Sequence, residues 1–472
     1  MNTFQKRSAM VVYCCLIILF FFAYPCTLSS CSGRSPNLPE KQINEISTFV
    51  FPDTGYMPPS GAKYKEIRSV NKSKPPVIID IVGNLENKKL IKISDFASSI
   101  RYIFLQQPPD LKFTKIYGIA SDDKYIFVNA LEGLFCFSTD GVYLYTICVN
   151  QIEFINGFSR ITDGVLNNVD LLNGTLIFRT YNWPSIETGV TDIRLNVFDI
   201  KELEAKMLFD VKNSELKNLN PQPKYQRQMD PKKDAGGSSR YLLMDDLSLL
   251  ISNSLTHVAV YGDTLCKFND YDIFTLPHGA NSYVHVSSSI YRINGNIMLQ
   301  KAHNDTVFRV ISPNRLEAAY VMRWDKYKPD INQHVAGSAL EGKFVLGSWI
   351  ETLRFIFIHY TEGRDYPSRR REGKVKDHWA IYDKTAKTLT HHITSSGQST
   401  NPTPIPPMFE NNIEPIGMPF YPQGINHKDE MYMSFSKEQL KNYIASGKFQ
   451  NDKLQAIYKN MPDDGFCLMI VK

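Results

Sequence analysis

A dense basic stretch is the first place in this chain where residue types could bind a ligand. Its cations are Arg364, Arg369, Arg370, Arg371, Lys374 and Lys376, and His378 and Trp379 follow closely. Guanidinium groups match carboxylate and phosphate oxygens, so an acidic glycan or a lipid head group is one candidate ligand. The alternative is a solvated loop that joins two strands, 355–360 and 378–383. Because so many like charges repel one another, we predict a mobile solvent loop at residues 364–376, with any functional face at the mouth of the propeller channel instead.

Histidines offer a second kind of chemistry, but their positions do not form a motif. His391 and His392 follow a strand-like segment, so their rings would point to opposite faces, and an exposed strand end is favoured over metal ligation. His359, His378 and His427 are scattered, and each is only a formal candidate for a catalytic base. We find no phosphate-binding glycine loop, no zinc-binding helix motif, no paired cysteines and no nucleophile elbow. The sequence therefore predicts no metal and no cofactor.

Trp183 lies in an Asn-Trp-Pro sequence that is typical of a loop. An exposed indole there could stack on a sugar ring, whereas packing against its own hairpin is the favoured alternative.

The first 31 residues have the pattern of an export signal. Lys6 and Arg7 precede an apolar run from Met10 to Ala23, and the segment ends in Leu-Ser-Ser before Cys31. This ending resembles a lipobox, in which the cysteine becomes the lipid-bearing first residue of the mature protein. An uncleaved anchor helix is the alternative, but about 14 apolar residues are short for a membrane span. We predict a signal peptide at residues 1–30, lipidation at Cys31 and a membrane-tethered protein outside the cytoplasm.

The composition excludes some functions and predicts free thiols. The net charge of +5 falls to +3 once the signal loses Lys6 and Arg7, which is too small to indicate nucleic-acid binding. Four cysteines remain beyond Cys31: Cys136, Cys148, Cys266 and Cys467. In a hairpin turned at Asp140-Gly141, Cys136 faces a position near Leu144 or Tyr145. Cys148 is then roughly 10 Å further along, too far for a disulfide. We expect four buried free thiols.

The rest of the chain is rich in Phe and Tyr and carries the turn signals of hairpins. Residues 31–76 are polar and proline-rich, which predicts a tether. Asp-Gly or Asn-Gly pairs at Asp140-Gly141, Asn173-Gly174 and Asn294-Gly295 separate β-rich runs. Four short strands within residues 115–148 form a meander the size of one propeller blade, and similar meanders follow.

We therefore predict an all-β fold in which residues 77–472 form a six-bladed β-propeller of four-stranded antiparallel blades. Strands 77–81 and 466–471, at opposite ends of this domain, are predicted to share the blade that closes the ring. One region is helical: Ser436 and Gln439 form a capping box for a helix that Gly447 stops, and Asn451 caps a second short helix.

Several segments resemble the six-bladed β-propeller lipoproteins of Bacteroidetes that carry domains of unknown function. The resemblance covers residues 77–472 and rests on segments 91–96, 100–105, 122–140, 303–310 and 462–472. It implies a propeller fold and a location in the cell envelope, and it supplies no activity. Many relatives have a Gly-Pro-rich loop after the first blade, which residues 149–161 lack, so a ligand bound there is not transferable.

Taken together, the sequence predicts an outer-membrane lipoprotein, facing the periplasm or the cell surface, that works as a ligand-binding or scaffolding module. Its expected partners are the membrane, through the N-terminal lipid, and an envelope protein or glycan, with no nucleic acid. The alternative is an envelope hydrolase or lyase that acts on a glycan or lactone at the channel mouth, although a non-enzymatic role is favoured. Convergence of several ionisable side chains from different blades would favour the enzyme.

Overall fold

The computed structural model describes the chain in segments. They are residues 65–67, 74–107, 112–155, 158–172, 174–182, 192–201, 225–229, 241–243, 249–251, 256–258, 264–268, 289–300, 305–312, 315–329, 340–364, 367–393, 408–414, 417–445 and 452–472.

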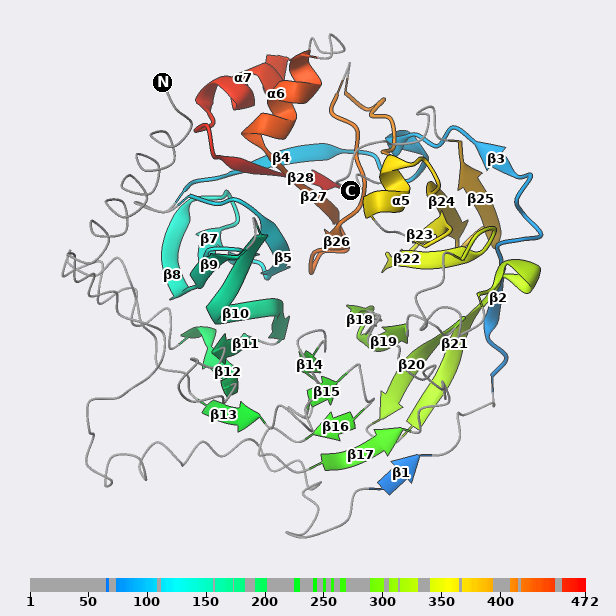
Figure 1. Ribbon diagram of the computed structural model, residues 1–472, viewed down its shortest axis with the longest axis horizontal. Helices are drawn as coiled ribbons and strands as arrows, with labels where there is room; N and C mark the ends of the chain where they lie inside the picture. The colour runs from blue at the N-terminus through cyan, green and yellow to red at the C-terminus, as the bar shows by residue number, and fades with distance from the viewer. Residues whose placement is uncertain are drawn as a thin grey trace, which may run out of the picture.

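Within these segments the strands form six sheets that follow one another around a ring (Figure 1). The first sheet contains β5 (Ile116–Ser121), β6 (Tyr125–Ala130), β7 (Gly133–Ser138) and β8 (Tyr143–Val149). The second contains β9 (Gln151–Ile155), β10 (Phe158–Leu172), β11 (Thr175–Asn182), β12 (Asp192–Asp199) and β13 (Tyr225–Met229). The third contains β14 (Tyr241–Leu243), β15 (Leu249–Ile251), β16 (Thr256–Val258) and β17 (Thr264–Phe268).

The remaining sheets complete the ring. The fourth contains β18 (Ser289–Ile293), β19 (Asn296–Gln300), β20 (Thr306–Ser312) and β21 (Arg315–Arg323). The fifth contains β22 (Phe344–Glu351), β23 (Phe355–Glu362), β24 (Lys376–Asp383) and β25 (Thr388–His392). The sixth contains β26 (Gly424–Ile425), β27 (Met431–Ser436) and β28 (Phe466–Val471). This arrangement confirms the predicted all-β, propeller-type architecture.

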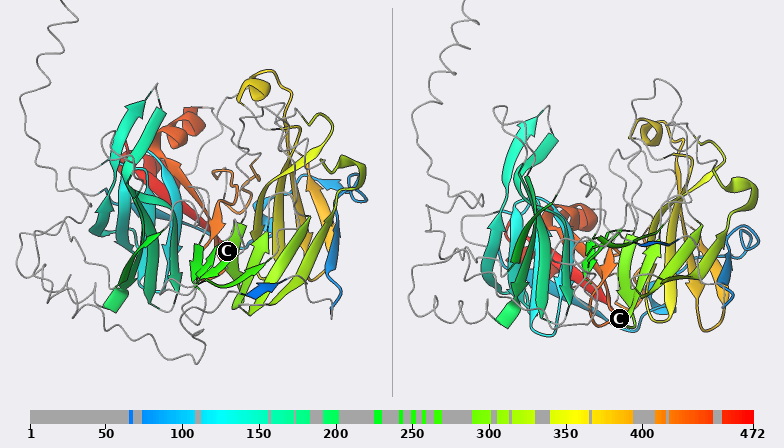
Figure 2. Two further views of the ribbon diagram at one scale, coloured as in Figure 1. Left: turned by 60° about the horizontal axis from the view of Figure 1, so that its bottom comes forward. Right: turned by 90° about the horizontal axis from the view of Figure 1, so that it is seen from below.

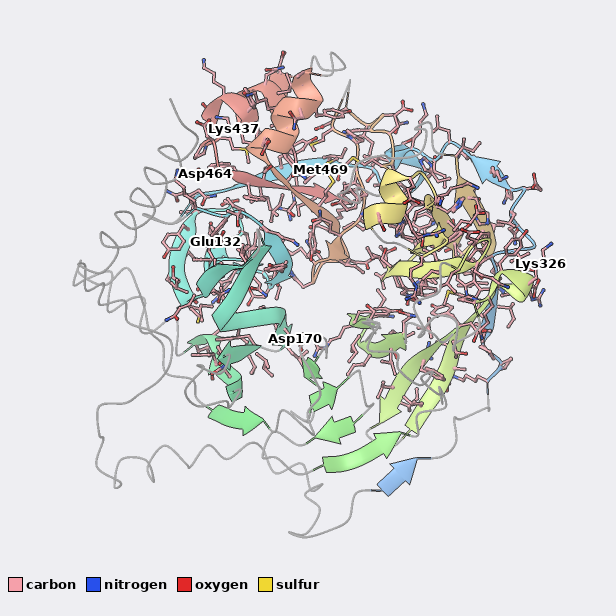
Figure 3. The ribbon with its side chains drawn as sticks, viewed as in Figure 1. Glu132, Asp170, Lys326, Lys437, Asp464 and Met469 are labelled. Carbon is pink, nitrogen blue, oxygen red and sulfur yellow. The ribbon has the colours of Figure 1, made fainter. Side chains whose placement is uncertain are left out.

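Alternating side chains explain why the sheets stack face to face around the ring. On β28, Phe466, Leu468 and Ile470 join the core shared with the first sheet. The intervening Cys467, Met469 and Val471 join the core shared with the fifth sheet (Figure 3). Because successive residues of a strand point to opposite faces, a strand buried on both sides needs an unbroken apolar run. The sequence Phe-Cys-Leu-Met-Ile-Val has this property.

The N-terminal part of the described chain runs along the outer edges of four successive sheets (Figure 1). β1 (Lys65–Ile67) pairs in parallel with β17, β2 (Val77–Asp80) with β21, and β3 (Lys88–Lys89) with β25. β4 (Ile100–Leu105) then pairs antiparallel with β28. We call β1 to β4 the N-terminal belt. The belt covers outer sheet edges that would otherwise expose unpaired backbone groups.

The belt corrects three expectations from the sequence. The ring is closed by residues 100–105 against β28, whereas residues 77–81, predicted to do so, lie two sheets away. The third, fourth and fifth sheets contain a fifth, parallel strand, so they are not simply four-stranded and antiparallel. Residues 65–67 also form a strand inside the stretch interpreted as a tether. Short edge strands such as these carry little apolar periodicity, which is why their pairing is not visible in the sequence.

Helices are few among the described residues. The two helices predicted near the C-terminus are present as α6 (Lys437–Ala445) and α7 (Asp452–Asn460), and they lie at the outer rim of the sixth sheet (Figure 1). The Gln439 side chain accepts from the Ser436 backbone N–H at 2.8 Å, and the Gln439 N–H donates to Ser436 Oγ at 3.2 Å, which confirms the capping box. Three shorter helical turns are α5 (Pro367–Arg371), η1 (Ile93–Asp95) and η2 (Asp325–Tyr327). No helix in the described segments is long and apolar enough to cross a membrane.

Local turn chemistry behaves as the sequence predicted at two hairpins. Gly141, with φ of +85°, turns β7 into β8, and Asn294-Gly295, with φ of 46° and 70°, turns β18 into β19. In the first hairpin Cys136 lies opposite Tyr145 and Cys148 lies opposite Leu134. Cys136, Cys148 and Cys467 are free and buried, as expected. The side chain of Cys266 lies outside the described residues.

Candidate functional site

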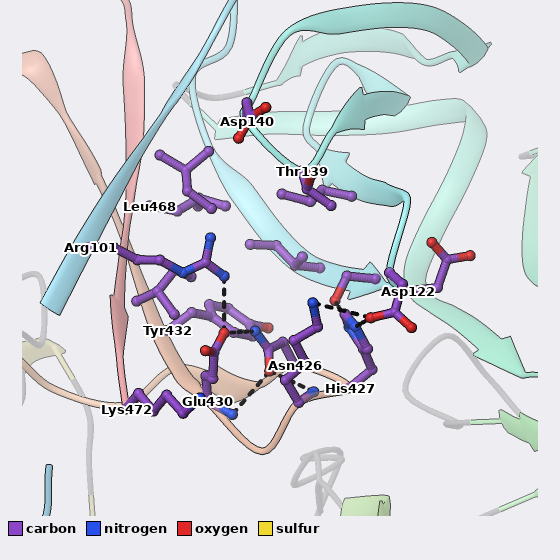
Figure 4. Close-up of a pocket in the computed structure, with 17 residues that line it drawn as sticks. Arg101, Asp122, Thr139, Asp140, Asn426, His427, Glu430, Tyr432, Leu468 and Lys472 are labelled. Atoms are coloured by element: carbon purple, nitrogen blue, oxygen red, sulfur yellow. Dashed lines mark hydrogen bonds and ion pairs between the residues drawn. The ribbon is translucent and has the colours of Figure 1, made fainter. Parts of the chain in front are cut away.

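A cavity of about 340 Å³ opens where the sixth sheet meets the first (Figure 4). Its walls are the β26–β27 loop, the β5–β6 and β7–β8 turns, Arg101 on the belt strand β4 and the end of β28. We call this cavity the seam pocket, because it lies where strands from the two ends of the domain come together. A volume of this size is typical of sites for small ligands.

The β26–β27 loop is held in shape by one asparagine. Asn426 Oδ1 accepts from the backbone N–H groups of Lys428 (2.9 Å) and Glu430 (3.0 Å), and Asn426 Nδ2 donates to Glu430 Oε2 at 2.8 Å. Asp429, with φ of +62°, adopts the left-handed conformation that such a tight turn requires and that Asp tolerates. The loop therefore presents its side chains in fixed directions.

Two of these side chains reach the first sheet and meet a serine and an aspartate there. His427 Nδ1 lies 3.0 Å from Ser121 Oγ, and His427 Nε2 lies 3.1 Å from Asp123 Oδ1. Lys428 Nζ also lies 3.1 Å from Asp123 Oδ1. The hydrogen bonds from Lys428 and His427 lower the pKa of Asp123. The result is a hydroxyl, an imidazole and a carboxylate in series at the edge of the seam pocket.

A second polar pair lies on the other side of the pocket. Arg101 donates to Glu430 Oε2 at 2.9 Å (Figure 4). Burial tends to raise the pKa of Glu430, but the hydrogen bonds from Asn426 and Arg101 outweigh it and lower that pKa. Glu430 is therefore a fixed, ionised acceptor beside a fixed guanidinium donor.

The floor of the pocket is apolar and belongs to the core between the two sheets. It is formed by Ile103, Ile119, Ile126, Leu468 and Ile470, with Tyr432 beside them. An apolar floor with a few converging polar groups is the usual construction of a small-molecule site.

A smaller cavity of about 150 Å³ lies between the fourth and fifth sheets, around the buried carboxylate of Glu351. Glu351 accepts from the hydroxyl groups of Tyr291 and Tyr320, both at 2.7 Å, and from Lys384 Nζ at 3.1 Å. All of these contacts are internal, so the cluster has the character of a satisfied structural network. It ties the fourth sheet to the fifth.

The basic stretch is not the mobile loop that the sequence predicted. Arg370 is only 2 % exposed, and it donates to both oxygens of Asp377 at 2.6 and 2.9 Å. His359 Nε2 contacts the same carboxylate at 3.0 Å, and Arg364 is also buried. Burial tends to raise the pKa of Asp377, but these partners outweigh it and lower that pKa to about 2. Asp377 is one of the three acids among these cations, but a count of charges does not show that its carboxylate is buried against Arg370.

Arg369, His378 and Trp379 also make contacts within the protein, whereas Lys374 and Lys376 are about half exposed. Arg369 contacts Glu341 at 3.4 Å. His378 stacks on the ring of Tyr360 with centroids 5.0 Å apart, and burial lowers the pKa of His378 to about 4. Trp379 is buried in the core between the fifth and sixth sheets. The backbone of Arg371 lies in α5, and its side chain, like the whole of Trp183, is outside the described residues.

His391 and His392 form a buried pair and are not an exposed strand end. His391 contacts Tyr360 Oη and the carbonyl oxygen of Ile81, each at 3.1 Å, whereas His392 Nδ1 accepts from the Ile91 N–H at 3.1 Å. The two rings do point to different sides, as strand alternation predicts. Among the described residues, no three His, Cys, Asp or Glu side chains gather in a way that could hold a metal ion.

The basic stretch and the seam pocket lie toward opposite faces of the ring. α5 belongs to the connection from β23 to β24. The β22–β23 turn lies at the opposite end of these strands and contacts the pocket loop. In this contact both oxygens of Asp429 accept from the Leu353 N–H, at 3.0 and 2.9 Å. The side views agree, with α5 and the C-terminus toward opposite ends (Figure 2). Sequence reasoning missed the pocket because about 300 residues separate Ser121 and Asp123 from His427. The one available signal was that a closed propeller must bring its first and last sheets together.

Comparison with known proteins places the chain in a family. A family model described as a domain of unknown function (DUF4933) matches residues 59–446. The chain belongs to this family. The DUF4933 match includes the whole N-terminal belt, which begins at Lys65, and the β26–β27 loop of the seam pocket. No curated protein matches the chain.

A solved structure shares the overall fold of this DUF4933 protein at low sequence identity. A protein from Bacteroides fragilis that is described as exported has a TM-score of 0.51 and 11% identity, with 84% of this chain and 100% of that chain covered. A protein of unknown function from Bacteroides caccae has a TM-score of 0.33 and 10% identity, over 62% of this chain and 99% of that one. Virginiamycin B lyase from Staphylococcus aureus has a TM-score of 0.29 and 11% identity, over 64% and 90%. The last two overlaps are too loose to bear on this chain.

Proposed function

We propose that this protein is a lipid-anchored, extracytoplasmic propeller of six blades that binds a neutral, polyhydroxylated ligand in the seam pocket. The leader pattern before Cys31 supports export and anchoring. The six sheets of the described segments, which follow one another around a ring, support one blade for each sheet. A glycan of the cell envelope is the ligand class that fits this location.

The observation that carries the proposal is the construction of the seam pocket. It combines an apolar floor with polar side chains whose positions are fixed by hydrogen bonds. A site of this kind is organised before its ligand arrives, so little conformational entropy is lost on binding.

The charges of the lining indicate a neutral ligand. The cations are Arg101, Lys428 and Lys472, and the carboxylates are Asp122, Asp123, Asp140 and Glu430. Arg101 and Lys428 already have carboxylate partners in the pocket. A charged ligand would have to compete with these pairs. A hydroxyl group can donate to Glu430 and accept from Arg101 without breaking the pair, because it is both donor and acceptor.

Titration calorimetry with a panel of neutral and acidic oligosaccharides tests this proposal. The wild type should bind a neutral member of the panel, and Arg101→Ala should weaken that binding by roughly 10-fold or more, since a hydrogen bond to a charged group is lost. Arg354→Ala is the matched control, because Arg354 pairs with Asp383 on the fifth sheet, away from the pocket lining.

Equal binding by Arg101→Ala and wild type would contradict the assignment of the site. Binding of acidic sugars alone would contradict the assignment of the ligand class. A scaffolding role would instead be favoured by an envelope protein that co-purifies with wild type and Arg101→Ala alike, when no oligosaccharide binds.

A further inference from the structure

Ser121, His427 and Asp123 form a chain of contacts that the binding of a polyol does not require. Ser121 Oγ lies 3.0 Å from His427 Nδ1, and His427 Nε2 lies 3.1 Å from Asp123 Oδ1. Both distances are within the range for hydrogen bonds. All three residues line the seam pocket, so a bound molecule can reach the hydroxyl group.

The backbone around the three residues is held by local hydrogen bonds. Ser121 is the last residue of β5, and the turn after it is fixed by Asp122 Oδ1, which accepts from the backbone N–H groups of Lys124 and Tyr125, both at 2.8 Å. His427 follows Asn426, which fixes the β26–β27 loop. The serine and aspartate come from the first sheet and the histidine from the sixth, so ring closure assembles the group.

The contacts define one consistent tautomer. If Nε2 carries the proton and donates to Asp123, then Nδ1 is unprotonated and accepts from the Ser121 hydroxyl group. A carboxylate that orients an imidazole, which in turn activates a hydroxyl nucleophile, is the arrangement used for acyl transfer on many unrelated folds.

The geometry points to Ser121 as the nucleophile of an esterase site whose substrates are carboxylic esters of small polyhydroxylated molecules. The alcohol part of this substrate class rests on the proposed function, whereas the ester part rests on the Ser121–His427–Asp123 contacts. An O-acylated sugar has both parts.

The reaction is balanced with water as the only co-reactant. Ser121 Oγ attacks the carbonyl carbon while its proton moves to His427 Nδ1. The bond from the carbonyl carbon to the alcohol oxygen breaks, and that oxygen takes the proton from His427, which leaves an acylated Ser121. Water then attacks the acyl carbon, again giving its proton to His427. The bond to Ser121 Oγ breaks as that oxygen takes the proton back from His427, which restores the hydroxyl group and releases a free carboxylic acid.

Lys428 supplies positive charge to this group. Its Nζ lies 3.1 Å from Asp123 Oδ1, so its side chain is held beside the imidazole. A fixed cation lowers the energy of negative charge that develops on a carbonyl oxygen nearby. Lys428 is thus a positioning residue for Asp123 and a source of favourable electrostatic potential.

Labelling with diisopropyl fluorophosphate tests the nucleophile directly. The reagent should add one diisopropylphosphoryl group to the folded protein, and peptide mapping should place it on Ser121. His427→Gln should slow labelling roughly 100-fold or more, because the general base is lost. Ser121→Ala should abolish labelling at this position. Ser138→Ala is the matched control, because Ser138 lies in the same sheet and its hydroxyl oxygen accepts from the Val142 N–H.

Hydrolysis of 4-nitrophenyl acetate provides a second readout. Wild type and Ser138→Ala should hydrolyse it fastest, His427→Gln should be slower, and Ser121→Ala should be slowest. A wild type that is labelled at Ser121 no faster than at other serines overturns the inference. If oligosaccharide binding in calorimetry persists while Ser121 is inert, only the esterase inference fails. If Ser121 is labelled and no oligosaccharide binds, the nucleophile stands and the polyol assignment of the alcohol fails.

Discussion

At the scale of single residues, the buried Arg370 shows how a basic cluster can be structural. Its guanidinium group has two short contacts with Asp377, which His359 also contacts. Repulsion among the six cations of the stretch is reduced because they do not all lie in one exposed loop. Arg370 and Arg364 are buried, and the charge of Arg370 is neutralised by Asp377.

Replacing Arg370 with Ser should lower the free energy of unfolding by about 3–5 kcal/mol, because the Asp377 carboxylate would be left buried with only His359 as its partner. Urea denaturation followed by intrinsic fluorescence measures this change. Arg354→Ser, which removes an exposed guanidinium from the same sheet, should cost less than about 1 kcal/mol. Equal effects of the two substitutions would contradict the structural role of Arg370.

The buried His392 makes the free energy of unfolding depend on pH. Burial lowers the pKa of His392 to about 4 from its ordinary value of 6.5, so the native state keeps it neutral while the unfolded state binds a proton at higher pH. The contribution to stability is complete above pH 6.5, falls progressively below that pH and is lost by about pH 4. It amounts to roughly 3 kcal/mol.

His392→Asn should therefore reduce the slope of stability against pH between pH 6.5 and 4, while Asn keeps an acceptor for the Ile91 N–H. Chemical denaturation at several pH values in this window measures the slope. Some dependence should remain, since burial also lowers the pKa values of His378 and His391. An unchanged slope in the variant would show that His392 titrates in the native state as it does in the unfolded chain.

At the scale of elements, the strands of the N-terminal belt should differ greatly in importance. β1 adds three residues to the edge of the third sheet, whereas β4 adds six residues that pair with β28 along its whole length and contribute Ile103 and Leu105 to the core. A chain that begins at residue 74 should melt within a few degrees of a chain that begins at residue 60. A chain that begins at residue 106 should not fold cooperatively, since the sixth sheet loses its outer strand.

Thermal unfolding by circular dichroism distinguishes these three chains. Removing residues 463–472 gives a complementary test, because it deletes β28 and should be as damaging as removing β4. Cooperative melting of either shortened chain at the temperature of the longest one would show that the ring does not depend on the β4–β28 pair.

Elements defined by neighbouring residues were predictable from the sequence, and elements defined by distant contacts were not. The Asn294-Gly295 turn and the Ser436–Gln439 capping box depend on a few adjacent residues. Lys88 and Lys89 form a strand only because β25 lies beside them, and nothing in two lysines predicts that. The seam pocket depends on contacts across about 300 residues, such as Ser121 with His427. The sequence therefore named His427 as a candidate, but it did not name its partners.

At the scale of the whole molecule, the lipid anchor stays a prediction that one substitution can test. Cys31→Ala should move the protein from the membrane to the soluble envelope fraction, because stable anchoring needs acyl chains on that cysteine. Fractionation with immunoblotting follows the distribution, and intact-mass analysis identifies the first residue. A mature protein that keeps Met1, or one with an unmodified Cys31, would exclude lipidation.

The N-terminal belt has a mechanical consequence for a protein held at its N-terminal side. A pulling force applied before Lys65 reaches β1 first and must then detach β2 and β3 before it loads β4 (Figure 1). The outer strands of three sheets would thus rupture in turn as sacrificial bonds. Each rupture lengthens the chain and so lowers the tension. The β4–β28 pair, which lies beside the seam pocket, is the last to be loaded.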